Sequence, residues 1–228
     1  MQLDSRLQAL ADFVKEGSRM ADIGTDHAYL PVYLVGQGKV SFAVAGDKNA
    51  GPCEAAKRTV QENGMSDRIE VRHGDGLGVL VPGEVDTVCI AGMGGTLISE
   101  ILHAHPEVLE TTETLVLQPM NAAAELRKWL YRHYWHIEDE ELALADGRIY
   151  EIIMAKHGRR KHPSPLMLSI GPVLWEKKSP LLKHHIESLL FQVKRMIAGM
   201  EKSERAKHTK KYLEAVENIK ALEERLKW

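Results

Sequence analysis

The chain has 228 residues, 44% of them hydrophobic and 27% charged, with a formal net charge of −2. This is the composition of a globular protein, and the length suffices for one full α/β domain with a smaller appendage. No apolar run reaches the ~18 residues that a membrane span requires, and residues 1–14 lack the basic-then-apolar pattern of a secretion signal. We therefore expect a cytoplasmic protein without membrane contact, whose two cysteines, Cys53 and Cys89, are buried thiols.

The charge is divided unevenly along the chain. Residues 1–156 contain 14 Lys and Arg against 24 Asp and Glu, whereas residues 157–228 contain 16 against 8. Such a split indicates two modules with different tasks, and the basic module is suited to a polyanion. A solvated helical surface explains the same excess of basic residues, so charge alone leaves both interpretations open.

The first elements are a helix and a short strand. Residues 3–14 have apolar residues at helical spacing. Arg6 on this helix is either a contact to a cofactor carboxylate or a solvated surface residue. Residues 20–23 form a short buried strand, and a second helix follows over residues 29–37.

A glycine turn joins this strand to the second helix. Gly24 closes the turn, at a place where a side chain would block the approach of a ligand. Asp22 and Asp26 flank it, and two carboxylates would repel a bare pyrophosphate. The turn therefore favours a ligand with an ammonium, a sulfonium or ribose hydroxyls, which indicates S-adenosylmethionine rather than NAD.

Asp47 follows a strand predicted over residues 41–45 and lies 23 residues beyond Gly24. An acid at this place is suited to accept hydrogen bonds from both ribose hydroxyls of a nucleoside. The alternative is that Asp47 caps the next helix, a role that Asn49 also suits.

Two further strand ends carry candidate residues. Asp75 follows a strand over residues 68–72 and is placed to accept a hydrogen bond from an adenine amino group, or else is a turn residue between two glycines. The most apolar strand, residues 85–91, leads into the glycine-rich residues 92–95, which let backbone approach a ligand. Met93 among them covers a flat base or fills the core.

The remaining strands complete a sheet. Residues 114–117 form the fifth strand, and Gln118 after it either reads a base edge or is a turn amide. An Asp-Gly turn joins two alternating runs, residues 135–144 and 148–156, into a hairpin. The order predicts a mostly parallel, doubly wound sheet with one antiparallel strand.

The C-terminal part is helical. Residues 157–165 form a basic linker, and from residue 180 onward apolar residues recur every three or four positions, with a break near residues 199–203. Two such stripes predict an antiparallel helical hairpin with coiled-coil packing.

Taken together, these motifs resemble the class I S-adenosylmethionine-dependent methyltransferases. DIGTDHAYLP, HGDGL and AGMGG resemble, more closely, the TrmK family, whose members methylate N1 of adenine 22 in bacterial tRNA. The resemblance covers essentially the full chain. It implies a Rossmann-like, seven-stranded class I methyltransferase sheet over residues 1–158, which binds S-adenosylmethionine, and an antiparallel coiled-coil appendage over residues 159–228, which binds tRNA.

The chain departs from many amino-group methyltransferases at two points. AGMGG replaces the Asn-Pro-Pro-Tyr box after the fourth strand, and GTD replaces the first GxG of the glycine turn. The residue that holds the target base is therefore open. We assign Asp26 to orientation of cofactor or base, His27 to polar positioning and Tyr29 to base packing; the alternatives are a helix cap, a satisfied polar residue and a core residue.

The predicted site residues fall into three groups, and no metal is expected. The catalytic group is Asp26, His27, Tyr29, Met93, Gly94 and Gln118. The cofactor-binding group is Arg6, Asp22, Gly24, Asp26, Asp47, Asp75, Gly76, Ala91, Gly92 and Met93. The RNA-binding group is Arg159, Arg160, Lys161, Lys194, Arg195, Lys207, Lys210 and Lys211.

Other functions fit parts of the pattern. A methyltransferase for a small molecule or a protein is possible, although the basic appendage argues mildly against it. An RNA-binding module with a vestigial cofactor pocket is compatible with the missing box. A nicotinamide-dependent oxidoreductase is disfavoured by the acids at the turn.

Overall fold

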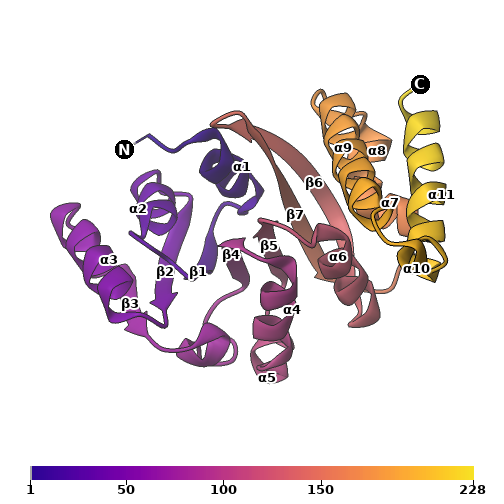
Figure 1. Ribbon diagram of the computed structural model, residues 1–228. Coiled ribbons are helices and arrows are strands. Elements are labelled where there is room, and N and C mark those ends of the chain that lie inside the picture. The colour runs from indigo at the N-terminus through magenta and orange to yellow at the C-terminus, as the bar shows by residue number, and fades with distance from the viewer. Residues whose placement is uncertain (1) are drawn as a thin grey trace. The chain divides into compact units, whose positions relative to one another are not determined.

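The structure, a computed structural model, describes residues 2–228. It consists of two compact units, one reaching to Lys161 and the other spanning His162–Trp228 (Figure 1). The division lies close to the boundary after residue 158 that the sequence suggests. None of the helices in the described residues is long and apolar enough to cross a membrane.

The first unit contains a seven-stranded sheet with the order β3-β2-β1-β4-β5-β7-β6. The strands are β1 (Ser18–Ile23), β2 (Val40–Asp47), β3 (Ile69–His73), β4 (Thr87–Met93), β5 (Thr114–Pro119), β6 (Trp135–Ala145) and β7 (Arg148–His157). β7 runs antiparallel to both of its neighbours, and the other pairings are parallel. The predicted sheet with one antiparallel strand is confirmed.

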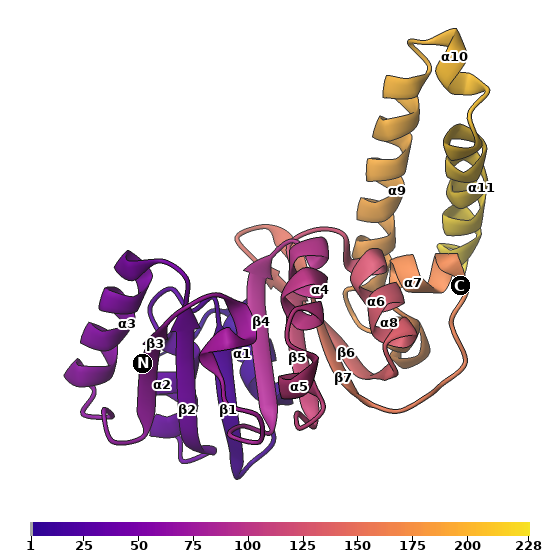
Figure 2. The same cartoon turned by 90° about the horizontal axis from the view of Figure 1, so that it is seen from below.

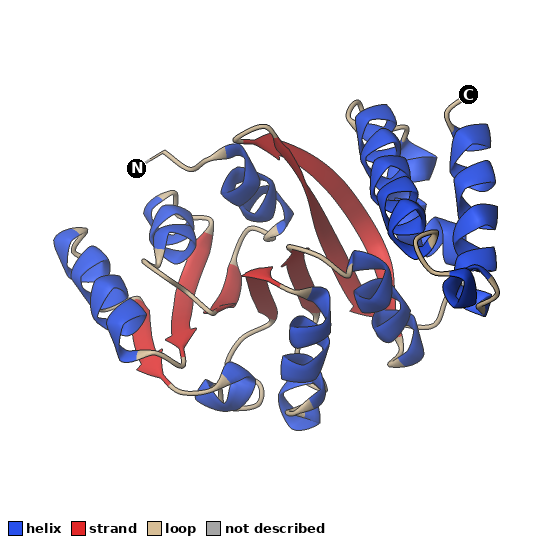
Figure 3. Cartoon of the chain, viewed as in Figure 1, coloured by secondary structure: helices blue, strands red, loops and turns tan. Residues whose placement is uncertain are grey.

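Helices cover both faces of this sheet (Figure 3). On one face lie α1 (Ser5–Phe13), α2 (Tyr29–Gly36) and α3 (Ala50–Glu62), whose apolar residues share one core. On the other lie α4 (Gly95–His103) and α6 (Ala123–Arg132), with the short η1 (Gly76–Val79) and α5 (Pro106–Leu109) packed against α4. The central strands β1 and β4 are buried on both faces of the sheet, as their continuous apolar runs predict.

Several strands extend further than the sequence indicates, and two of these extensions matter for the site. β2 runs to Asp47 itself, and β4 continues to Met93, which pairs with Pro119 across a register shift at Gly92. The sequence placed Met93 in a turn after the strand; the pairing with β5 carries it on in the sheet. The short helices η1 and α5 were not expected, because four residues are too few to show a helical period.

The second unit is helical. It contains α7 (Pro165–Ile170), α8 (Pro172–Lys177), α9 (Leu182–Met200), α10 (Glu204–Lys207) and α11 (Lys210–Arg225). The two long helices, α9 and α11, lie side by side, as Figure 2 shows, and bury Ile186 and Ile197 on α9 and Ala215 and Leu222 on α11. The predicted helical hairpin is present, whereas α7 and α8 were not expected.

The sheet order determines where a ligand site can form. From β1 the chain moves outward to β2 and β3, and it then returns to place β4 on the other side of β1. In wound parallel sheets, ligands bind beyond the carboxyl ends of the strands at such a reversal. The ends of β1, β2 and β4 meet there.

Candidate active site

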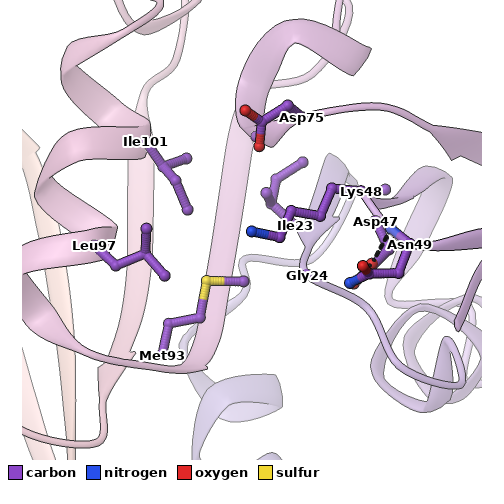
Figure 4. A pocket seen from close by; sticks show the side chains of 11 residues that line it. Ile23, Gly24, Asp47, Lys48, Asn49, Asp75, Met93, Leu97 and Ile101 are labelled. Atoms are coloured by element: carbon purple, nitrogen blue, oxygen red, sulfur yellow. Dashed lines mark hydrogen bonds between the residues drawn. The ribbon is translucent and has the colours of Figure 1, made fainter.

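A pocket of about 100 Å³ opens at the edge where β1, β2 and β4 end (Figure 4). Its walls come from the ends of these strands, the loop after β3 and the first turns of α4. The lining residues are Ile23, Gly24, Gly46, Asp47, Lys48, Asn49, Asp75, Gly76, Met93, Leu97 and Ile101.

The pocket combines predicted and unexpected residues. Of the predicted residues, it brings together Gly24, Asp47, Asp75, Gly76 and Met93. The sequence reasoning missed Lys48 and Asn49, although both directly follow Asp47 and their position was a usable signal. It also missed Leu97 and Ile101, which form an apolar wall on α4, because helical spacing alone does not say that a helix face borders a cavity.

The space beside Gly24 is filled by the Met93 side chain, which leaves no room for a Cβ atom at residue 24. The φ of Gly24 is +78°, and a Cβ built there would lie 1.9 Å from the Met93 methyl carbon. The turn is bonded to β2, since the Gly24 and Thr25 amides donate to the Gly46 carbonyl at 2.8 and 3.1 Å. The Met93 side chain therefore narrows the pocket beside the glycine turn (Figure 4).

Asp47 and Asp75 give the pocket its acidic side. One Asp47 carboxylate oxygen accepts hydrogen bonds from the Asn49 backbone amide at 2.7 Å and the Asn49 side chain at 3.0 Å. α3 begins after Asn49, and no side chain caps its first turn. The Asp47 carboxylate instead binds the amide of Asn49 itself, so Asp47 organises the turn before the helix and does not cap it. Asp75 precedes Gly76, whose φ of +52° turns the chain toward Ile101 on α4.

Gln118 lies beneath the pocket edge and holds β4. Its side chain is fully buried, and its oxygen accepts hydrogen bonds from Arg6 at 3.0 Å and from the Gly92 amide at 3.1 Å. Gly92, with φ +77°, is the residue that the β4–β5 register skips. The buried amide thus holds the bulge that aims Met93 into the pocket, and it is not at the surface where a base edge would be read. Ala91 and Gly94 flank this bulge and Met93.

Asp22 is a buried carboxyl group at the end of β1. Burial raises its pKa to about 6, while a hydrogen bond from Thr25 and the charge of Arg6 act in the opposite direction, and the charge of Asp47 adds to the rise. Arg6 also lies 5.8 Å from the centre of the Tyr150 ring. Arg6 and Asp22 lie behind the pocket, next to the residues that shape it.

Asp26, His27 and Tyr29 form an exposed group beside the turn. The His27 ring stacks on Tyr29 with 5.1 Å between centres, and its Nε2 lies 3.5 Å from the Asp26 carboxylate. The amide of Ala28, the residue before α2, donates to the Thr25 hydroxyl at 3.1 Å, and no side chain caps α2, so Asp26 is not a helix cap. Tyr29 is 44% exposed and is not a core residue. These side chains are free to meet a second substrate.

The predicted RNA-binding residues are distributed over both units. In the first unit, Arg159 lies 4.3 Å over the Tyr134 ring and Arg160 pairs with Glu138 at 2.9 Å. In the second unit, Lys194, Lys207 and Lys210 each pair with a glutamate on the helical surface. Exposed pairs of this kind are weak and exchange readily for phosphate. Lys161, Arg195 and Lys211 are exposed at the surface of their units.

The residues fit an adenosine-containing methyl donor. The Gly24 turn allows close approach, Asp47 suits a ribose diol, Asp75 suits an amino group, and Leu97 and Ile101 suit a flat base. The pocket volume of about 100 Å³ is smaller than the roughly 300–1,000 Å³ of typical ligand sites, and the flexible Met93 side chain is the lining group that narrows it beside Gly24. Among the described residues, no group of three or more His, Cys, Asp and Glu side chains is placed to hold a metal ion.

Comparisons with known proteins show the family to which the chain belongs. A family model described as TrmK, tRNA (adenine(22)-N(1))-methyltransferase, matches residues 20–224. The chain is 38% identical to the tRNA (adenine(22)-N(1))-methyltransferase of Bacillus subtilis over 96% of this chain and 97% of that one.

Solved structures of similar proteins have the same fold. The structure of the B. subtilis m1A22 tRNA methyltransferase TrmK superposes with a TM-score of 0.90 at 36% identity, covering 99% of both chains. A Streptococcus pneumoniae protein solved with S-adenosyl-L-methionine superposes with a TM-score of 0.87 at 32% identity, covering 99% of this chain and all of that one. The resemblance found in the sequence is confirmed, and the chain belongs to the TrmK family.

Proposed function

We propose that the protein transfers a methyl group from S-adenosylmethionine to N1 of adenine 22 in bacterial tRNA. The observation that carries this proposal is the match to the TrmK family over nearly the whole chain, together with a pocket that unites Gly24, Asp47 and Asp75. Because tRNA is the substrate, the protein acts in the cytoplasm.

The first unit holds the cofactor. Asp47 accepts hydrogen bonds from the ribose, Asp75 accepts one from the adenine amino group, and Leu97 and Ile101 cover the base. When bound, S-adenosylmethionine supplies an electrophilic methyl group on a cationic sulfur. The acidic groups Asp22 and Asp47 favour this positive charge over a phosphate-rich cofactor.

The target base meets the exposed group at the turn. N1 of a neutral adenine has a free lone pair, so no strong base is needed to activate it. Tyr29 packs against the ring while Asp26 and His27 orient it, and the rate gain comes mainly from holding nitrogen, carbon and sulfur in line. A carboxylate facing the amino group would stabilise the cationic product. Gln118 acts indirectly, by fixing Gly92 and Met93.

The second unit and the basic segment before it hold the RNA. N1 lies on the Watson–Crick edge, so the base must be unpaired or extruded before it reaches the pocket. Contacts from Arg159, Arg160 and the lysines of α9 to α11 to phosphates would recognise the RNA mainly by shape.

The test is to incubate the protein with labelled S-adenosylmethionine and an unmodified tRNA transcript, and then identify the labelled nucleoside. We expect 1-methyladenosine, and no label in a transcript with guanine at position 22. The Asp26→Ala variant should keep the thermal melting temperature, because this side chain is exposed, and lose most of the transfer. Label in a protein or small molecule, or in another nucleoside, would contradict the proposal.

A further inference from the structure

A second, larger cavity lies at the opposite edge of the sheet from the cofactor pocket. Its volume is about 500 Å³, within the range of ligand sites. It is formed where β5 and β6 begin: Leu109 and Glu110 precede β5, Trp135 opens β6, and the last turn of α6 closes one side. Strands of six residues separate the two edges by roughly 20 Å, so one ligand group cannot occupy both sites.

The walls of this cavity, which we call the aromatic cleft, are ring systems. Trp129 and His133 stack with 4.1 Å between centres and an angle of 17°, and His103 meets the His133 ring edge-on at 5.7 Å. On the other side Trp135 lies 3.8 Å from His157, whose Nε2 is held by the Leu109 carbonyl at 2.8 Å. Trp135 is itself buried, so His157 presents the accessible face beside it, and the Trp129–His133 pair presents another.

Tyr134 adds an exposed ring at the mouth of the cleft. It is 55% exposed, and its backbone has φ +62°, a conformation that residues other than glycine rarely adopt. The Tyr134 carbonyl accepts a hydrogen bond from the Gly158 amide at 2.8 Å, which fixes the turn. The guanidinium of Arg159 lies 4.3 Å over the ring. An exposed aromatic ring with a cation over one face can stack a nucleobase on its other face, while the cation contacts the adjoining phosphate.

The charge at the rim favours an anionic ligand. Arg132 lines the cleft and Arg159 lies at its mouth, against the single lining carboxylate of Glu110. His157 lines the cleft, and the chain continues from it into the basic residues Arg160 and Lys161 of the linker over residues 157–165.

We propose that the aromatic cleft binds an unpaired base of the same RNA, stacked on Tyr134 and the Trp129–His133 pair, with its phosphate on Arg132 or Arg159. This rests on the proposed function, since the RNA is its substrate. The base held here is not the one that is methylated, because the cofactor pocket lies at the other edge. The cleft anchors the RNA while the target adenine enters the active site.

The experiment compares a His133→Ala/Tyr134→Ala protein with the unaltered one. Both side chains are exposed, so the fold should be retained. The Tyr134→Phe variant keeps the aromatic ring and should bind RNA as tightly as the unaltered protein. Leu144→Ala is the matched control, because Leu144 is a 46% exposed apolar side chain on β6. Affinity for a fluorescent tRNA transcript and for single-stranded oligoadenylate is measured by anisotropy, S-adenosylhomocysteine affinity by calorimetry, and methyl transfer by kinetics.

We expect the double variant to bind both RNAs about tenfold more weakly. The KM for tRNA should rise while kcat and cofactor affinity stay unchanged. Equal RNA affinity in the double variant and the unaltered protein would overturn the anchor, as would equal weakening in Leu144→Ala. If the unaltered protein fails to methylate tRNA but the double variant still loses RNA binding, the proposed function fails and the cleft stands.

Discussion

Asp22 is a buried carboxyl group whose pKa of about 6 lies above the value of 3.8 for a free side chain. Between these values the folded protein binds more protons than the unfolded chain, so the free energy of unfolding falls as pH rises through this window. At pH 7.5 this group therefore makes the free energy of unfolding about 3 kcal/mol lower than it is below pH 4, where the carboxyl group is protonated in both states. The pocket therefore keeps a negative charge at neutral pH at the expense of stability, which suits a cationic ligand.

The Asp22→Asn variant should be more stable than the unaltered protein at pH 7.5, because it buries no charge. The difference in melting temperature should shrink toward zero as pH falls below about 4, where Asp22 is protonated. Thermal denaturation at several pH values without cofactor measures this. Asp26→Asn, on an exposed side chain in the same turn, is the control. A melting difference that is constant across pH would refute the prediction.

The end of β4 and the glycine turn after β1 depend on each other through direct contacts. Gln118 holds the Gly92 bulge, the bulge sends Met93 across the pocket, and Met93 lies where a side chain on residue 24 would be. Because Met93 has several rotatable bonds, it can swing away and still contact a bound nucleoside. The glycine is thus needed both for its backbone and for the space beside it.

The Gly24→Ala variant tests this arrangement against Gly38→Ala. Both glycines have positive φ, +78° and +70°, so both substitutions strain the backbone by about 1–2 kcal/mol. A Cβ at residue 38 meets nothing within 4 Å, whereas one at residue 24 displaces Met93 into the pocket. We expect both variants to have a lower melting temperature than the unaltered protein. Only Gly24→Ala should bind S-adenosylhomocysteine at least tenfold more weakly, as measured by calorimetry. Equal affinities would show that the space beside Gly24 is not used.

At the scale of the whole molecule, acidic and basic residues are divided between the two units. The acidic residues dominate the sheet unit, and the basic residues dominate the helical unit. Phosphate contacts release counterions, so their contribution to affinity falls steeply with salt.

A protein ending at Lys161 should keep its affinity for S-adenosylhomocysteine and lose most of its affinity for tRNA. The affinity that remains should depend less on salt than that of the full chain, because fewer phosphates are contacted. Filter binding at two salt concentrations measures both effects, and Lys207→Gln/Lys210→Gln/Lys211→Gln in the full chain should show a smaller change in the same direction. Unaltered tRNA affinity in the shortened protein would place the RNA on the sheet unit alone.

Part of the site was predictable from local patterns. Gly24, Asp47 and Asp75 each follow a short apolar run, and the carboxyl ends of parallel strands share one edge of a sheet, so their meeting follows from the strand order. The sheet itself was predictable for the same reason, since buried parallel strands show as continuous apolar runs. The sequence by itself therefore determined the sheet, the edge at which Gly24, Asp47 and Asp75 meet, and the family.

Only the tertiary structure decided the rest. Gln118 looked like a residue at the rim, but its burial under Arg6 and Gly92 depends on how α1 and β4 pack against β5. The wall of Leu97 and Ile101 depends on the tilt of α4 over β4, and the aromatic cleft joins residues from four separate segments. Such contacts leave no local period or motif, because burial and proximity across the chain are set by packing, to which each segment contributes only one side.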